Sequence, residues 1–75
     1  MPRTQRFTAI IEREEDVYVA LCPEVDVASQ GDTIEEARSN LIEALTLFFD
    51  TAPPVEVERR LRSEVLVTQV EVPVG

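Results

Sequence analysis

One long amphipathic helix is predicted between residues 33 and 50, and it constrains the fold more than any other feature. Thr33 and Glu36 have the spacing of a capping box, which closes the first turn of a helix. Apolar residues then recur at helical spacing, within an arc of about 100°. They are Ile34, Ala37, Leu41, Ala44, Leu45 and Phe48. Pro53 and Pro54 end the helix, because proline cannot continue its hydrogen bonding. A helix with one apolar face must pack against another element.

Two stretches before this helix alternate in polarity and predict an antiparallel hairpin. They cover residues 6–13 and 17–22, and the acidic run Glu14–Asp16 separates them. Residues 25–29 form a weaker third strand. We expect Gly31 to interrupt it, since glycine adopts a positive φ without steric cost.

The part after the long helix predicts a short helix and a last strand. Residues 54–62 begin with proline and carry acids early and arginines late, which favours a helix over a strand. Residues 64–72 are rich in β-branched side chains, and we expect them to join the sheet. Residues 1–75 are thus expected to form one α+β domain of order β-β-β-α-(short α)-β. It would be a four-stranded sheet with one long helix on one face.

A single helix covers only one face of such a sheet, and a chain of 75 residues has little left for the other. A domain this small buries only about 60% of the surface that its unfolded chain exposes. We expect the open face to carry Tyr18, Ala20 and Ile10, which are apolar for a solvent-facing surface. A homodimer or higher oligomer with Tyr18 and Ala20 in its contact is therefore predicted.

The absence of histidine excludes most arrangements of catalytic side chains. Without an imidazole there is no Ser–His or Cys–His pair and no histidine metal ligand. Cys22 is the single cysteine, so an intrachain disulfide is impossible and a reducing cytoplasm is the simplest compartment. The central residues of the first predicted strand, 8–10, lack the carboxylate that two-metal hydrolysis of RNA requires. We expect no enzyme activity, no catalytic residue, no cofactor and no metal site.

The net charge of −8 indicates the class of partner. Affinity for a phosphate backbone comes from many cations, so direct binding of nucleic acid is not expected. No apolar run approaches the roughly 20 residues of a membrane span either. A basic protein is favoured. The candidate contacts are Glu14, Glu15, Asp16, Glu24, Asp26 and Leu47. Each also has a simpler interpretation as a solvated surface residue.

Three stretches together resemble the HicB antitoxin family. They are residues 18–24 (YVALCPE), 29–37 (SQGDTIEEA) and 40–44 (NLIEA), and the strand pattern at 7–12 fits the usual start of the family. The resemblance implies a partial ribonuclease H-like fold without ribonuclease activity. It also implies neutralisation of a HicA-type toxin, a small basic protein that cleaves mRNA. The chain is similar to a short, single-domain member without a C-terminal DNA-binding domain. A solitary structural or regulatory module without a toxin partner stays open as the alternative.

Overall fold

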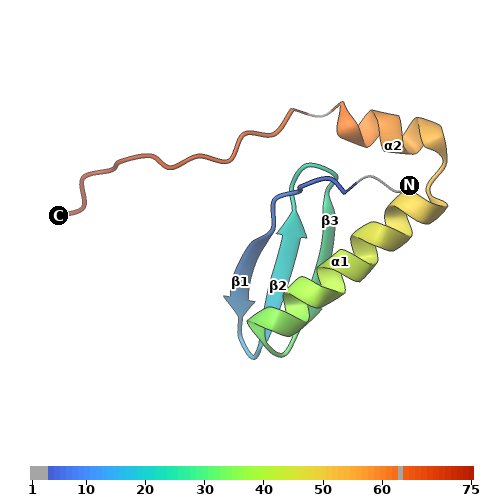
Figure 1. Ribbon diagram of the computed structural model, residues 1–75. Coiled ribbons are helices and arrows are strands. Elements are labelled where there is room, and N and C mark those ends of the chain that lie inside the picture. Colours follow the sequence, from blue (N-terminus) through green and yellow to red (C-terminus); the bar gives the residue numbers. More distant parts are fainter. Residues whose placement is uncertain (1–3, 63) are drawn as a thin grey trace.

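A three-stranded antiparallel sheet and two helices make up the computed structural model, which describes residues 4–62 and 64–75 (Figure 1). The elements are β1 (Ile10–Glu14), β2 (Val17–Cys22), β3 (Val27–Gly31), α1 (Ile34–Thr51) and α2 (Pro54–Leu61). The strand order is β1-β2-β3, and α1 lies across one face of the sheet. The α+β class and the predicted order of these five elements are confirmed, including the short helix after the prolines.

The register of the sheet follows from two short connections. Glu14 pairs with Val17 across a two-residue turn, in which Glu15 has a φ of 55°. On the other side of β2, Cys22 pairs with Val27. β2 is therefore central, and β1 and β3 are the edges of the sheet. β1 and β3 each begin later than predicted, since residues 6–9 are extended but outside the sheet and β3 starts at Val27 rather than at residue 25.

The start of α1 is as its sequence predicts. Thr33 is the N-cap, and its Oγ1 accepts a hydrogen bond from the backbone N–H of Glu36 at 3.0 Å. This bond satisfies one of the four N–H groups that a helix leaves free at its start. At the other end, the N–H of Ala52 donates to the carbonyl oxygen of Phe48, and Pro53 follows. The predicted bounds of this helix are confirmed to within one residue.

Small side chains fill the core between the sheet and α1. The buried hydrophobic residues are Ala20, Cys22, Val25, Ala37 and Leu41. Gly31 is also buried, but its φ is not positive, so the predicted reason for a glycine here is wrong. A Cβ atom on Gly31 would lie 2.6 Å from the backbone nitrogen of Ala37. Glycine is required because α1 approaches the backbone of β3 so closely.

The prediction assigned the wrong face of β2 to solvent. Ala20 is completely buried in the core, and Tyr18, on the same side of the strand, is half-buried against it. The face turned away from α1 instead carries Val19 and Leu21, together with Ile10, which was placed there correctly. Ala20 is therefore a core residue and not a surface contact. The reason is steric: alanine and cysteine on β2 let a helix lie close, whereas valine and leucine would hold it away.

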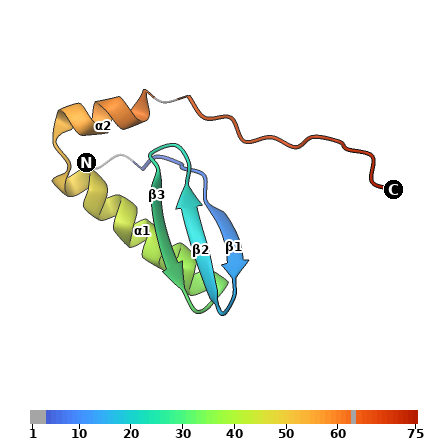
Figure 2. The same ribbon diagram turned by 180° about the vertical axis from the view of Figure 1, so that it is seen from behind.

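The predicted fourth strand does not join the sheet, which has three strands rather than four. Residues 64–75 form an extended segment, here called the tail, that runs away from the sheet in both views (Figures 1 and 2). Every residue of the tail is exposed. Its alternating β-branched sequence gives it an extended shape, but that pattern alone does not bring it to the edge of its own sheet.

α2 is held against the rest of the domain by one of its arginines. Arg60 of α2 donates from Nη1 to the carbonyl oxygen of Val25 at 2.5 Å, and from Nε to Glu56 at 2.8 Å. Its guanidinium carbon lies 5.1 Å from the ring centroid of Phe48, a cation–π contact. Arg60 thus fastens α2 to the β2–β3 loop and to the end of α1. The tail leaves from a helix whose orientation is fixed.

Candidate functional site

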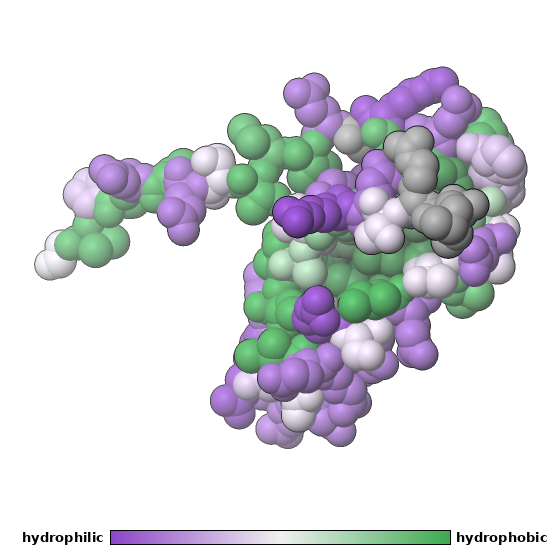
Figure 3. Space-filling view, in the orientation of Figure 1, coloured by the Kyte–Doolittle hydropathy of each residue, from purple (hydrophilic) through white to green (hydrophobic). Residues whose placement is uncertain are grey.

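Acidic side chains from the sheet and from α1 gather at one end of the molecule. β3 runs antiparallel to β2, so the chain enters α1 beside the β1–β2 turn (Figures 1 and 2). We call this surface the acidic end. Its residues are Glu12, Glu14, Glu15, Asp16, Asp32, Glu35 and Glu36, and all of them are exposed. Figure 3 shows this lower part of the molecule as hydrophilic.

Little positive charge offsets the acidic end. Arg13 lies within it and supplies one positive charge against seven carboxylates; its Nε donates to the backbone oxygen of Glu15 at 3.2 Å. Among residues 4–62 and 64–75, the side-chain ion pairs all lie in α2 and its C-cap residue Arg62. Unpaired carboxylates on one surface create a negative potential that attracts a cationic partner at long range. The chemistry of this end is therefore that of a binding surface for a basic molecule.

The structure places the candidate contacts predicted from the sequence in separate parts of the molecule. Glu14, which is the last residue of β1 rather than a turn residue, lies at the acidic end together with the turn residues Glu15 and Asp16. Glu24 and Asp26 lie in the β2–β3 loop, at the opposite end of the sheet. Leu47 is on α1 and is 62% exposed, apart from both groups of acids. Tyr18 and Ala20, the predicted dimer contact, lie on the face of β2 that α1 covers.

Sequence reasoning missed Asp32, Glu35 and Glu36 as part of the same surface as the turn. Their charges were already explained as favourable at the positive end of the helix dipole. The signal was available in the element order, because a three-stranded meander returns the chain to the end where its first turn lies. The same acidic side chains both favour the start of the helix through its dipole and contribute to the surface charge.

The carboxylate of Glu24 has partners inside the chain. Its Oε2 accepts hydrogen bonds from the backbone N–H of Thr8 at 2.9 Å and from the Thr8 hydroxyl at 2.7 Å. Partial desolvation raises the pKa of Glu24, but the hydrogen bonds from Thr8 outweigh it, so the pKa lies below its usual value. Glu24 thus ties the extended residues before β1 to the β2–β3 loop. Its role in the described chain is structural.

We expect Glu24 to make folding stability depend on pH. A carboxyl group with a lowered native pKa stabilises the fold fully above the unfolded value, about 4.3 for glutamate, and this stability is lost as the pH falls through the native pKa. Glu24→Gln removes the titrating group, so its urea-unfolding midpoint should fall less than that of the wild type between pH 6 and pH 3. Glu43→Gln, at an exposed acid of α1, should keep the wild-type dependence. Equal slopes for the two variants would contradict the role given to Glu24.

Cys22 behaves as a small apolar side chain. It is completely buried, with its Sγ 3.5 Å from Oε1 of Glu24. Burial raises the pKa of the Cys22 thiol, and the Glu24 carboxylate beside it raises that pKa further. A protonated, buried thiol is neither a good nucleophile nor a good metal ligand.

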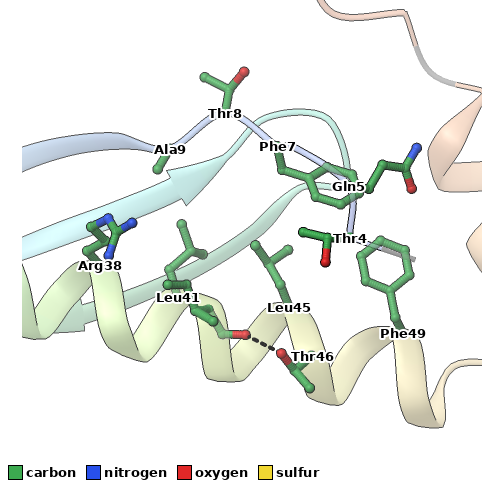
Figure 4. A pocket seen from close by; sticks show the side chains of 11 residues that line it. Thr4, Gln5, Phe7, Thr8, Ala9, Arg38, Leu41, Leu45, Thr46 and Phe49 are labelled. Atoms are coloured by element: carbon green, nitrogen blue, oxygen red, sulfur yellow. Dashed lines mark hydrogen bonds between the residues drawn. The ribbon is translucent and has the colours of Figure 1, made fainter. Parts of the chain in front are cut away.

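An apolar groove lies between α1 and the extended residues 4–9, which lead into β1 (Figure 4). Its volume is about 510 Å³. Leu41, Leu45 and Phe49 point from α1 toward Phe7, and the rings of Phe7 and Phe49 stack with centroids 5.4 Å apart. The rest of the lining is Thr4, Gln5, Thr8, Ala9, Arg38, Ile42 and Thr46. Figure 3 shows apolar surface in the middle of the molecule, above the hydrophilic lower part.

The carboxylates of the acidic end are spread over a surface rather than directed at one point. Within the described residues, no group of three or more acids or thiols is close enough to hold a metal ion. Glu12 does occupy the middle of β1, but it belongs to no such group. In the same part of the chain, no helix has the length and apolarity that crossing a bilayer requires.

A comparison with known proteins finds a relative that matches almost the whole chain. UPF0150 protein ssl0738 of Synechocystis sp. is 40% identical over 68 residues, which are 88% of this chain and 93% of the relative. No family model and no solved structure matches the chain. The match therefore concerns the domain as a whole and not one of its motifs.

Proposed function

The chain belongs to the UPF0150 family, and from this premise we propose that it is a non-catalytic, cytoplasmic protein-binding module of the antitoxin type. Its partner is a small basic toxin of the HicA type that cleaves mRNA. The acidic end covers the surface with which this toxin contacts RNA. The observation that supports the proposal is that exposed carboxylates from the sheet and from α1 meet at one end with almost no offsetting charge.

The proposed mechanism is occlusion. A toxin that binds RNA presents cations spaced for phosphate groups, and affinity for RNA depends on those cations. The acidic end offers dispersed carboxylates to the same cations. Its field also accelerates the encounter, since complementary charge raises association rates more than it slows dissociation. The hydrogen-bonded turn and the capped helix start fix the backbone that carries these carboxylates, so little backbone needs to be ordered when the partner binds.

This role requires no chemistry from the chain itself. The sequence has no histidine, and its single thiol is buried and protonated. Inhibition by coverage needs only a complementary surface. The purified chain is thus expected not to cleave RNA in the presence of Mg²⁺ or Mn²⁺.

The test compares two charge-neutralised variants that have equal net charge. Glu14→Gln with Asp16→Asn removes two carboxylates from the acidic end. Glu43→Gln with Asp50→Asn removes two exposed carboxylates from α1 outside it. In stopped-flow binding to a purified HicA-type toxin at low salt, the first variant should associate about tenfold more slowly and the second within about twofold of the wild type. Raising the salt concentration should reduce the difference between them.

Each other outcome has a definite meaning. Equal slowing of both variants would assign the effect to net charge and not to the acidic end. Absence of any binding, with toxin activity on RNA undiminished, would favour the solitary module without a toxin. Metal-dependent RNA cleavage by the pure chain would overturn the non-catalytic role.

A further inference from the structure

We propose that the tail of one copy docks along the apolar groove of a second copy, as an added strand beside β1, and that two copies exchange tails reciprocally. The surface involved centres on the groove and adjoins the acidic end only at the last residues of β1. The proposal does not depend on toxin binding and can fail or succeed without it.

The tail has the pattern of a strand with one apolar face that needs covering. Side chains alternate between the two sides of an extended chain, so every second residue shares a face. One face carries Leu66, Val70, Val72 and Val74, which are 83%, 79%, 67% and 90% exposed. The other face carries Val65 and Val67 and then turns polar at Gln69 and Glu71, so the two faces differ most in the second half of the tail. A row of exposed apolar side chains marks a surface that binds a partner.

The groove offers what such a strand needs, namely a free strand edge and an apolar lining. β1 is an edge of the sheet, and an edge strand presents unpaired backbone N–H and C=O groups to an incoming strand. The lining beside it is mainly apolar, with Leu41, Leu45 and Phe49 on the helix side and Phe7 on the other. A nine-residue strand spans about 30 Å, which is enough to follow residues 6–14 along this edge.

The charges of the two surfaces also match. Glu64 and Glu71 are the charged residues of the tail, and both are acidic. Arg38 is the charged residue of the groove lining. A tail with bases in place of these acids would meet Arg38 with like charge. The pairing thus favours this segment over a basic one.

The anchoring of α2 selects a second copy as the source of the tail. Arg60 is bound to the carbonyl oxygen of Val25 and to Glu56, and it stacks over Phe48. These contacts fix the helix from which the tail departs, and the tail runs away from its own sheet (Figures 1 and 2). Docking in the same chain would require the tail to reverse this direction. Docking on a neighbour requires no such change.

Reciprocal exchange gives a closed dimer. Each copy donates one tail and receives one, so the two contacts are equivalent by a twofold axis and no tail is left over. The exchange also pairs the free edge of β1 in both copies. It adds apolar burial to a core in which five hydrophobic residues are buried among those that the structure describes.

The first experiment tests whether the apolar face of the tail holds the dimer. Sedimentation equilibrium of the wild-type chain at micromolar concentration should give about twice the 8.4 kDa chain mass. Val70→Glu places a charge on the apolar face, and Gln69→Glu adds the same charge to the other face. Val70→Glu should raise the dimer dissociation constant by about 100-fold, and Gln69→Glu by less than about fivefold. At dilutions where both variants are monomeric, their far-UV circular dichroism spectra should agree, because the tail is exposed in the single chain.

The second experiment tests whether the tail reaches a different chain. A chain with Ala9→Cys, in the groove, is mixed with a chain carrying a cysteine at position 66, 68, 70 or 72, and the mixture is oxidised. We expect a disulfide-linked species of twice the chain mass for at least one position. It should be absent when either variant is oxidised alone, since the native Cys22 is buried.

Three outcomes would overturn the proposal. The first is a wild-type monomer at every concentration. The second is equal weakening of the dimer by Val70→Glu and Gln69→Glu. The third is a disulfide that forms only within one chain when both cysteines are placed on it, which would mean that the tail closes on its own sheet.

Discussion

Replacing Leu41 by alanine is expected to lower the free energy of unfolding by about 2–5 kcal/mol. Leu41 is 2% exposed and is the largest fully buried side chain of the core. Its truncation removes apolar contacts with the sheet and leaves a cavity that its neighbours fill only in part. A domain of this size has about 4–11 kcal/mol of stability in total. The variant should therefore unfold at a much lower urea concentration, monitored by circular dichroism.

Leu47→Ala is the matched control for this prediction. It makes the same chemical change on the same helix, but at a side chain that is 62% exposed. Its effect should be within about 0.5 kcal/mol of zero, as for most surface substitutions. Similar losses in the two variants would mean that the buried face of α1 is assigned wrongly. Both melts should be run at one protein concentration, because self-association also contributes to stability.

Gly31→Ala is expected to destabilise the chain by about 1–3 kcal/mol or more, through overlap rather than through a cavity. The added Cβ would lie 2.6 Å from the nitrogen of Ala37 and 2.8 Å from the carbonyl carbon of Glu36. Both are backbone atoms of the first turns of α1, so no side-chain rotation relieves the overlap. The helix must move away from β3. In calorimetry this should lower Tm by about 5–20 °C, since 1 kcal/mol corresponds to about 4–8 °C in a domain of this size.

Gln30→Ala separates this steric effect from a general sensitivity of β3. Gln30 precedes Gly31 in the same strand, and its side chain is exposed. Its replacement should change Tm by only a few degrees. If the Gly31→Ala variant had the same Tm as the wild type, β3 and α1 would not be in close contact at Gly31.

The elements encoded by local chemistry were predictable from the sequence. The bounds of β2 were predicted as the structure has them, because an acidic turn and Pro23 flank an alternating run. The start of α1 was predicted because Thr33 and Glu36 form a cap that depends on neighbouring residues alone. Neither prediction requires knowledge of contacts with residues distant in the sequence.

The face of β2 was not predictable from alternation. Val17, Val19 and Leu21 are more apolar than Tyr18, Ala20 and Cys22, and hydrophobicity alone places the first set against the helix. The structure places Ala20 and Cys22 there. Side-chain volume decided the outcome, because a helix packs closest where the strand offers the smallest residues. Gly31 and Ala37 are also small residues that indicate a close approach of strand and helix. They could be interpreted in this way only once β3 and α1 were known to face each other.

The tail and the acidic end needed knowledge of the topology. Alternation in residues 64–75 predicts an extended chain, but it does not say which edge, or which molecule, that chain pairs with. The acids at the start of α1 join Glu14–Asp16 in one surface because the meander returns the chain to the end of the sheet where its first turn lies. That return is visible only once the topology is known. In both cases the missing information was the direction of a connection.

The close contact between the sheet and α1 has a consequence for how such a domain can evolve. Ala20, Cys22, Gly31 and Ala37 together set the distance between the two layers. A larger side chain at one of these positions pushes the layers apart and opens gaps at the others. Accepted substitutions should therefore occur in compensating pairs, in which one side chain becomes larger and another becomes smaller. We expect these four positions to drift together in relatives of this chain, while the exposed face of α1 changes freely.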